Sequence, residues 1–360
     1  MELLNQISEL LPISSPFELI RVEKDERALE VHLYLSVSKT HLPSADYRIH
    51  SYYPREWEHL KLFQYRTFIH CDLPIYRHKL TGKLTKASVS FSRDFSRFTL
   101  LYEQEIMRLM RIHFCFTTVA KQMNINVQRV EKIYHFYTKE LDNPLMDEVC
   151  SNIGYDETST RKGHDYITMF VNMDTHKVID IYDGKSAECV KQFFQDHPYP
   201  EAVKNISIDM SPAFISGAKT FFPQAKLTFD KWHIIKLLYK HLDELDKKAY
   251  VFKSYIELLM KDLTSFFKEN DLLKAKAQIC FIADFAQEQM GNNPISKTIL
   301  RHLDGIAQYV ESKLSNGLLE GMNSKIQTIK RIAKGFRYKQ NFKKMIRFAF
   351  NSQVVSSKII

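Results

Sequence analysis

The chain has 360 residues, of which 44% are hydrophobic, and its formal net charge is +9. This length predicts two or three domains, and the positive charge favours a polyanionic partner, with nucleic acid ahead of an anionic membrane surface. The five cysteines are scattered without a CxxC pair, which argues against a disulfide framework and against a four-cysteine zinc site. We expect no signal peptide and no membrane span, and a reducing cytoplasm as the compartment.

Residues 1–100 are rich in aromatic and basic side chains. EVHLYLSVS alternates apolar and polar residues as a strand does, and SYYPREWEHLKLFQYRTFIHCDLP interleaves arginines with tyrosines and Trp57. Such a surface neutralises phosphates and stacks on bases. A small β-domain core with a solvated basic face is the alternative. We expect a β-containing DNA-binding arm.

Residues 101–145 have the outline of a helix-turn-helix. Thr117 or Thr118 is the expected cap of a first helix over residues 119–123, and Asn124 begins a tight turn. Apolar residues then recur at helical spacing from Val127. The second helix would present three side chains to a major groove, namely Gln128, Arg129 and Lys132. A plain helical hairpin remains the alternative.

From residue 146 the pattern changes to strands. Residues 151–183 contain three runs rich in Val, Ile, Tyr and Phe, separated by turn residues, which predicts three antiparallel strands with Asp156 on the first. A helix, a fourth strand ending at Asp209, a second helix and a fifth strand ending at Asp230 follow. Acidic residues thus fall at strand ends, where open α/β sheets place their ligands.

The last third of the chain reads as helical. Residues 234–312 form an expected helical insertion, and a further helix begins at Leu318. Glu320, Asn323 and Gln327 form a polar stripe on that helix, beside a separate apolar stripe. The segment KRIAKGFRYKQNFKKMIRF follows and suits a surface that tracks phosphates.

Three acids stand out on separate elements: Asp156, Asp209 and Glu320. Phosphodiester chemistry with two Mg²⁺ ions needs carboxylates that converge in this way, and hard oxygen ligands suit that ion. Ordinary surface acids and helix caps are the alternative that spacing alone leaves open.

The residues around these acids resemble a known family. IGYDETSTRKGHDYIT, SIDMSPAFISGA, FDKWHIIKLL and NGLLEGMNSKIQTIKRIAKGFR together resemble the bacterial insertion-sequence transposases of the ISL-three family, which are DDE enzymes. The resemblance implies an α/β fold with an RNase H-like mixed sheet, over residues 146–350, with Asp156, Asp209 and Glu320 as the catalytic, metal-binding triad. It also implies that Asp230 and His233 form an auxiliary pair, and that the cofactor is Mg²⁺ or Mn²⁺, as two ions.

The N-terminal part departs from that family pattern. A cysteine-rich zinc-binding module is expected there, but residues 42–46 read LPSAD, and the later region LPIYRHKLTG has His78 without a cysteine. We therefore expect no zinc, and an apolar core that draws on Trp57, Phe63, Phe68 and Phe91.

These observations predict a DNA transposase that binds terminal inverted repeats and target DNA, works at the nucleoid and assembles as a homo-oligomer on DNA, with no membrane partner. Five side chains are the expected phosphate contacts near the site, namely Lys162, His164, Arg331, Lys334 and Arg337. An inactive or domesticated relative that only binds DNA is the first alternative. An RNase H-like nuclease without strand transfer is the second.

Overall fold

The structure is a computed structural model that falls into two compact units, one ending at Tyr137 and the other beginning at Thr138. The residues that it describes are 13, 15–38, 41–143, 149–161, 165–229, 233, 265, 269–290 and 294–351. Among them, no helix is both long enough and apolar enough to cross a bilayer.

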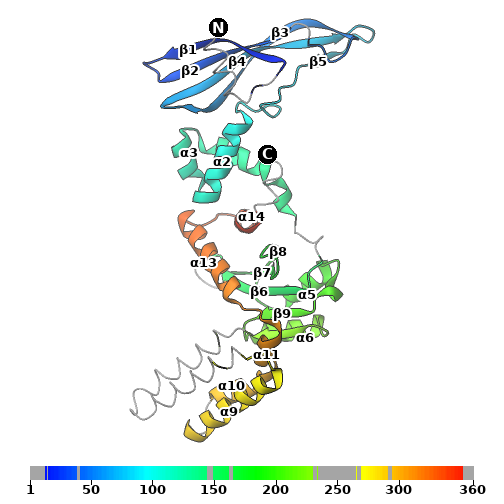
Figure 1. Cartoon of the computed structure of the whole chain (residues 1–360), viewed down its shortest axis with the longest axis vertical. Helices are drawn as coiled ribbons and strands as arrows, with labels where there is room; N and C mark the ends of the chain where they lie inside the picture. Colours follow the sequence, from blue (N-terminus) through cyan, green and yellow to red (C-terminus); the bar gives the residue numbers. More distant parts are fainter. Residues whose placement is uncertain are drawn as a thin grey trace. The chain divides into compact units, whose positions relative to one another are not determined.

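The first unit begins with one sheet (Figure 1). Its strands are β1 (Phe17–Asp25), β2 (Glu30–Val37), β3 (Tyr47–Leu62), β4 (Tyr65–His78) and β5 (Leu84–Lys86). The order is β1-β2-β4-β3, with β5 on β4, and the β2–β4 pair alone among these pairs is parallel. Strand alternation sends every second side chain of β2 into the core, as the sequence predicts.

The core of this sheet corrects part of the expectation. Trp57 and Phe91 are buried and meet edge to face, with ring centroids 5.1 Å apart. Phe63, in contrast, lies in the turn between β3 and β4 and is exposed, and Phe68 is only half-buried. Phe63 was wrongly expected in the core because its apolar character was taken as a sign of burial, whereas the two-residue turn points it away from the sheet.

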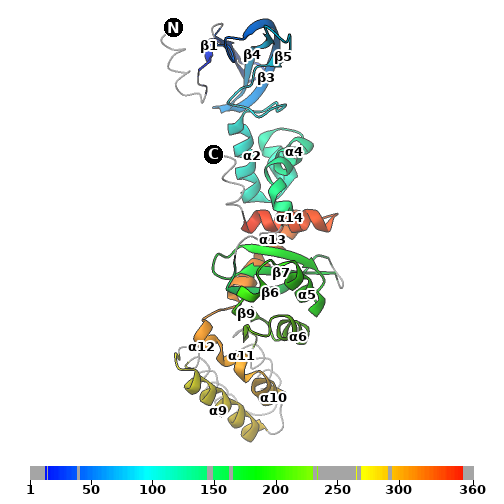
Figure 2. The same cartoon turned by 90° about the vertical axis from the view of Figure 1, so that its right-hand side faces the viewer.

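Three helices complete the first unit, and Figure 2 shows α2 and α4 side by side. Their bounds are α2 (Leu100–His113), α3 (Phe116–Met123) and α4 (Val127–Tyr137). The expected cap at Thr117 or Thr118 is wrong, because α3 starts at Phe116 after Cys115. Asn124 adopts the left-handed conformation that ends α3, and Asn126 Oδ1 accepts a hydrogen bond from Gln128 N at 2.8 Å.

The second unit is built on a mixed sheet. Its strands are β6 (Asn152–Ser159), β7 (Tyr166–Asn172), β8 (Val178–Asp183), β9 (Asn205–Ile208) and β10 (Lys226–Phe229). The order is β10-β9-β6-β7-β8. β6, β7 and β8 are antiparallel, as the sequence predicts, and β9 is parallel to both β6 and β10.

Helices cover both faces of this sheet (Figure 1). The helices on one face are α5 (Ala187–Asp196) and α6 (Pro212–Phe221), whose buried side chains share a core with Ile153 and Tyr155 of β6. On the other face, α13 (Gly317–Ile332) and α14 (Lys339–Phe350) pack against Met169 and Val171 of β7. The layers are therefore helix, sheet and helix.

The remaining described helices extend from the β10 end of the sheet. They are α9 (Leu272–Met290), α10 (Pro294–Arg301), α11 (Leu303–Ala307) and α12 (Tyr309–Ser312), preceded in the chain by the short turns η1 (Lys139–Asp142) and η2 (Pro200–Ala202). α11 lies against β10, where a Cβ on Gly305 would come within 2.3 Å of the Phe229 ring. The helical character predicted for residues 234–312 is confirmed over this part, whereas most of residues 234–268 lie outside the described residues.

Candidate active site

The site lies where β9 ends beside the middle of its neighbour β6. β6 and β9 run parallel with Gly154 opposite Ser207, so that Asp156 and Asp209 stand at the same level two residues further on. Asp156, Glu157 and Asp209 each offer a carboxylate oxygen, and these oxygens lie within 4.8 Å of one another. The sheet therefore assembles three carboxylates at its carboxyl edge.

The carboxylates of this cluster repel one another. Burial, with the neighbouring charges of Glu157 and Asp209, raises the pKa of Asp156 to about 7. Burial and the charge of Asp209 also raise the pKa of Glu157, while the charge of Lys185 opposes that shift. Clustered, partly buried carboxylates with raised pKa values are stabilised when a cation joins them.

Helix α13 lies in register with β6. A Cβ on Gly154 would meet Leu319 Cδ1 at 3.1 Å, Asn323 Nδ2 donates to Asp156 Oδ2 at 2.7 Å, and Gln327 Nε2 donates to Thr158 Oγ1 at 2.7 Å. Each step is four residues on the helix and two on the strand. Four helical residues rise about 6 Å and two strand residues about 6.6 Å, so the matching repeats.

The same register extends to β9. Asn316, the residue before α13, accepts a hydrogen bond from Ser207 Oγ at 2.5 Å, and both side chains are buried. Glu320 follows Asn316 by one helical turn, as Asp209 follows Ser207 by two strand residues. Glu320 therefore lies one helical turn beyond the residue that bonds β9.

Glu320 itself is exposed and is not part of the three-carboxylate cluster. The structure thus brings Asp156 and Asp209 together and sets the helix of Glu320 beside them. Glu157 was missed as a site residue because strand alternation predicts that it faces away from Asp156, whereas its carboxylate lies within 4.8 Å of that of Asp156; it belongs to the D-E pair of the family motif. Asn323 belonged to the predicted polar stripe, but its hydrogen bond to Asp156 could be seen only once the register of α13 on β6 was known.

The residues present fit a divalent metal ion. Carboxylate oxygens are the ligands that Mg²⁺ and Mn²⁺ prefer, and three are within reach of one ion. Asn323 orients Asp156 from outside the cluster, while its own Oδ1 is buried without a hydrogen-bond partner. A carboxylate held by a neighbouring amide in this way is typical of metal ligands.

The auxiliary pair is described only in part. Asp230 lies outside the described residues, as do Lys162 and His164. His233 is half-buried, and its charge opposes the rise in the pKa of both Asp156 and Glu157, so it lies close enough to act on the cluster. A positive charge beside carboxylates acts in this direction, because it favours their ionised form.

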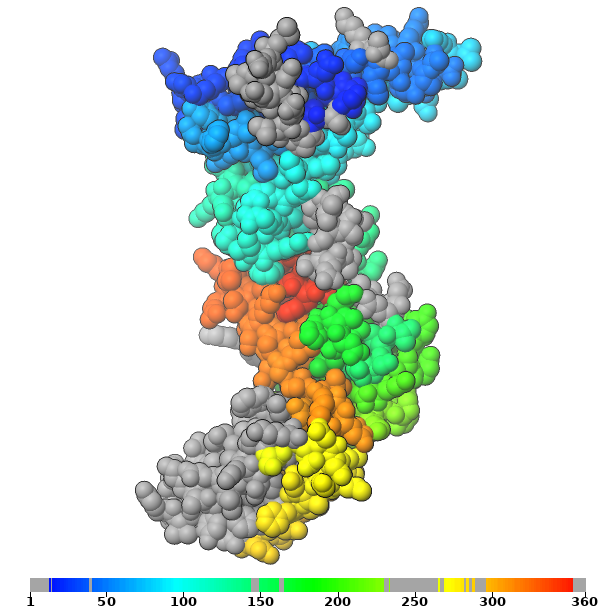
Figure 3. All heavy atoms as spheres, in the orientation of Figure 1, coloured from blue at the N-terminus to red at the C-terminus, as the bar shows by residue number. Residues whose placement is uncertain are grey.

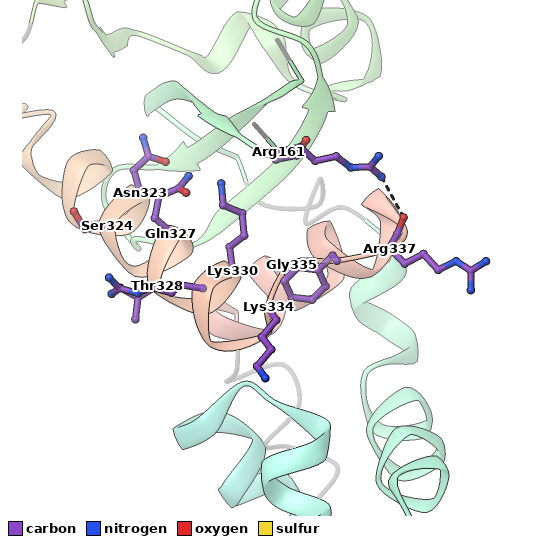
Figure 4. A pocket seen from close by; sticks show the side chains of 12 residues that line it. Arg161, Asn323, Ser324, Gln327, Thr328, Lys330, Lys334, Gly335 and Arg337 are labelled. Atoms are coloured by element: carbon purple, nitrogen blue, oxygen red, sulfur yellow. Dashed lines mark hydrogen bonds between the residues drawn. The ribbon is translucent and has the colours of Figure 1, made fainter. Parts of the chain in front are cut away.

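A basic cavity of about 1090 Å³ adjoins the cluster (Figure 4). Asn323 belongs to its lining, which connects the cavity to Asp156. The cationic side chains that line it are Arg161, Lys330, Arg331, Lys334 and Arg337. It therefore gathers the three expected phosphate contacts that the structure describes, and α13 reaches the surface in the orange segment of Figure 3.

Lys330 was not predicted as a site residue, although it begins the basic segment. Its Nζ donates to Ser159 O at 2.8 Å and to Ser159 Oγ at 3.2 Å, and burial lowers the pKa of this amine. It is the last of the contacts from Asn323 onward that fasten α13 to β6.

In the first unit, the side chains predicted to enter a major groove are all exposed on α4. These are Gln128, Arg129 and Lys132. Val130, Ile133 and Tyr134 are buried on the opposite side, as their spacing predicts. The helix thus presents a polar face while its apolar face packs against α2 and α3.

Comparison with known proteins agrees with this arrangement. Residues 153–287 and 247–346 match a family model described as a transposase with a DDE domain of the ISL3 group, and together cover more than half of the chain. Residues 87–138 match the helix-turn-helix domain of transposase family ISL3. The class is that of DDE transposases, which catalyse phosphoryl transfer on DNA.

Within that class, the chain belongs to the ISL3 family of transposases. It is similar to the transposase for insertion sequence element IS1001 of Bordetella parapertussis, with 24% identity over 361 residues, covering 84% of this chain and 86% of that protein. Membership implies use of a divalent metal ion and DNA as the ligand of the helix-turn-helix. The recognition of the family and of its mixed α/β fold from sequence is confirmed.

Proposed function

We propose that this transposase cuts DNA at the ends of an insertion sequence and joins the freed 3′-hydroxyl to target DNA. The observation that carries the proposal is the cluster of Asp156, Glu157 and Asp209, bonded through Asn323 to the helix of Glu320. The similarity to a transposase named for an insertion sequence element supports the choice of substrate.

In this proposal Asp156, Asp209 and Glu320 would hold Mg²⁺ or Mn²⁺, as two ions, and no zinc would be required. Bound cations supply neutralising charge at the scissile phosphate and a lowered pKa for the attacking hydroxyl or water. Asn323 keeps one Asp156 oxygen turned toward α13 and the carboxylate in a single orientation. His233 offsets part of the negative charge of the cluster, and Asp230 is its proposed auxiliary partner.

The reaction has two steps of in-line displacement. In the first, a water oxygen attacks phosphorus at the element end, the bond from phosphorus to the 3′-oxygen breaks, and the 3′-oxygen leaves as a hydroxyl. In the second, that 3′-hydroxyl attacks a target phosphate, forming a new ester and releasing a target 3′-hydroxyl. Positioning of the attacking and leaving oxygens accounts for most of the rate.

In this proposal the DNA lies along the cationic side chains of the protein. The cavity beside Asn323 holds backbone phosphates through Arg331, Lys334 and Arg337, with Lys162 and His164 as further contacts. α4 reads the terminal inverted repeat through Gln128, Arg129 and Lys132. We propose that the parts of the chain divide as residues 1–100, 101–145 and 146–350, and that two or more copies assemble on paired ends at the nucleoid.

A strand-transfer assay tests this function against its two alternatives. Purified protein is given a duplex with an exposed 3′-hydroxyl end, a supercoiled plasmid as target, and Mg²⁺ or Mn²⁺. Duplex joined covalently to plasmid is the result we expect. Nicked plasmid without joining would indicate a nuclease, and a mobility shift without any cut would indicate a protein that only binds DNA.

A further inference from the structure

The tip of the β3–β4 hairpin carries an aromatic side chain that the fold does not use. Phe63 is 93% exposed, and its backbone has a φ of 56°. A left-handed backbone conformation is uncommon for a bulky residue, and such a turn position normally takes glycine or asparagine. Neither packing nor backbone preference therefore explains a phenylalanine there.

A second apolar residue lies at the adjoining hairpin tip. Leu29, in the turn between β1 and β2, also has a positive φ, of 54°, and is 47% exposed. Its carbonyl accepts a hydrogen bond from Arg66 N at 2.9 Å, which joins the two tips. Lys61 is exposed close by on β3. The result is an apolar point beside the cationic side chain of Lys61, while the Arg66 side chain bonds Glu58 Oε1 at 3.1 Å and Glu30 Oε1 at 3.3 Å.

The hairpin end shares a groove with the helix-turn-helix. This groove, of about 540 Å³, is lined by Arg66 from β4 and by residues of α3, the turn and the start of α4. Among the latter are Lys121, Asn124, Asn126 and Arg129. The start of the second helix is the part of a helix-turn-helix that contacts base edges. The tip therefore stands next to the part of the unit that reads DNA.

Hydrogen bonds fix the sheet to the helices. Glu58 N donates to Arg97 O at 2.8 Å, Thr99 N donates to Glu58 O at 3.1 Å, and the His59 ring bonds Thr99 Oγ1 at 2.8 Å. Thr99 is the N-cap of α2. Because Glu58, His59 and Thr99 are buried and lie within one compact unit, the tip keeps a set position relative to α4.

We propose that the β3–β4 tip is a second DNA-binding element, in which Phe63 wedges between base pairs in the minor groove next to the major groove occupied by α4. Apolar wedges of this kind unstack a base step and kink the duplex. Lys61 would meet a flanking phosphate. The proposal rests on DNA binding by the helix-turn-helix and adds a shape-reading contact to it.

The test uses the full chain and one duplex that the wild-type protein enriches from a random-sequence pool. 2-Aminopurine is placed at each step of that duplex in turn, since its fluorescence rises when a base unstacks. The variants are Phe63→Asn, which suits the left-handed backbone but removes the wedge, and Phe63→Trp, which restores an aromatic ring. The matched control is Leu80→Asn, because Leu80 is 88% exposed beyond the opposite end of β4.

We expect one step to unstack with wild type, Phe63→Trp and Leu80→Asn, but not with Phe63→Asn. Phe63→Asn should also bind about tenfold more weakly, as loss of an aromatic contact to a base costs. Its melting temperature should be unchanged or higher, because no packing is lost and backbone strain is relieved.

Two results would overturn the inference. One is wild-type binding of the selected duplex without any unstacked step, or with a step that Phe63→Asn still unstacks. The other is a change in sedimentation of the DNA-free protein on Phe63→Asn, which would make the tip a protein contact. If the wild-type protein enriched no duplex at all, DNA binding by the helix-turn-helix would itself be wrong, so the two failures are distinguishable.

Discussion

In the proposed active site, the strands β6 and β9 and the helix α13 position their acidic residues by different physical means. Backbone pairing of β6 with β9 sets Asp156 and Asp209 side by side. The position of Glu320 depends instead on side-chain hydrogen bonds that hold α13 against those strands. Carboxylate oxygens of Asp156, Glu157 and Asp209 already lie within 4.8 Å of one another. Glu320 is exposed and does not belong to that group. In the proposed site, the sheet therefore already brings the strand acids together, whereas the position of Glu320 depends on the docking of α13.

The largest effect should come from removing the carboxylates of either region. Asp156→Asn, Asp209→Asn and Glu320→Gln should each lower end cleavage by about a thousandfold or more, about 4 kcal/mol of barrier, because each removes charge from the metal site. The melting temperature and the DNA affinity of each variant should stay close to those of wild type. The control is Glu188→Gln, an exposed acid on α5. A triad variant that keeps cleavage within about tenfold of wild type is misassigned.

Crowding the contact between β6 and α13 should have the next largest effect on cleavage. Gly154→Ala would set a Cβ at 2.5 Å from Met173 Sδ and 3.1 Å from Leu319 Cδ1, so the Met173 side chain must move and Leu319 of α13 must give by a few tenths of an ångström. We expect cleavage to fall about a hundredfold, since small displacements of catalytic groups have that effect. Gly321→Ala is the matched control for stability, because nothing lies within 4 Å of its added Cβ. Equal cleavage by Gly154→Ala and wild type would show that α13 docking is not limiting.

Loss of the bond that links the regions should have a smaller effect. Asn323→Ala removes the donor to Asp156 Oδ2, and we expect about a 10–100-fold loss of activity together with a higher Mg²⁺ requirement. Gln327→Ala breaks the neighbouring bond to Thr158, which contacts no carboxylate, and should leave the Mg²⁺ requirement unchanged. Titration of cleavage against Mg²⁺ separates the two, and parallel shifts in both variants would contradict the account.

If the basic cavity beside α13 binds DNA phosphates, its side chains should contribute to the salt dependence of DNA affinity. Arg331→Ala and Lys334→Ala should each weaken binding of all duplexes alike, and reduce by about one the slope of log affinity against log salt concentration. Lys191→Ala on α5 should leave the slope unchanged, because this lysine pairs with Glu188 away from the cavity. Sequence-dependent losses would mean that these side chains read bases instead.

The smallest effect should be a pH dependence of stabilisation by metal. The pKa of Asp156 rises from 3.8 to about 7, so between these values the folded chain keeps a proton that the unfolded chain releases. The metal-free fold therefore loses stability as pH rises through 7, and a cation offsets the loss. Added Mg²⁺ should raise the melting temperature more at pH 8 than at pH 5.5. The difference should disappear in Asp156→Asn, and equal gains at both pH values would contradict it.

Most of the site's outline could be predicted from the sequence. Asp156, Asp209 and the polar stripe of α13 follow from strand ends, helical spacing and linked motifs, and the structure gives each the expected element. Spacing within a strand could not reveal Glu157, because alternation predicts that it faces away from Asp156. The bond from Asn323 to Asp156 joins residues 167 positions apart, and no local pattern determines that register.

The first unit shows where local reasoning fails. The apolar and polar faces of α4 follow from periodicity, and they are as predicted. The start of α3 was placed late because Thr117 and Thr118 are good cap residues, whereas the helix begins at Phe116, whose ring meets Tyr134 with centroids 5.1 Å apart. Phe63 was assigned to a core by residue type alone, and only the turn geometry shows it at a tip.

The most direct test of the central claim is iron-directed cleavage of the protein on DNA. Fe²⁺ replaces Mg²⁺, and ascorbate with peroxide generates hydroxyl radicals that cut the backbone next to the bound metal. The account predicts cuts near Asp156, Asp209 and Glu320, all suppressed by excess Mg²⁺. Cuts near Asp156 and Asp209 with none near Glu320 would contradict it, because the helix would then contribute no ligand to the metal.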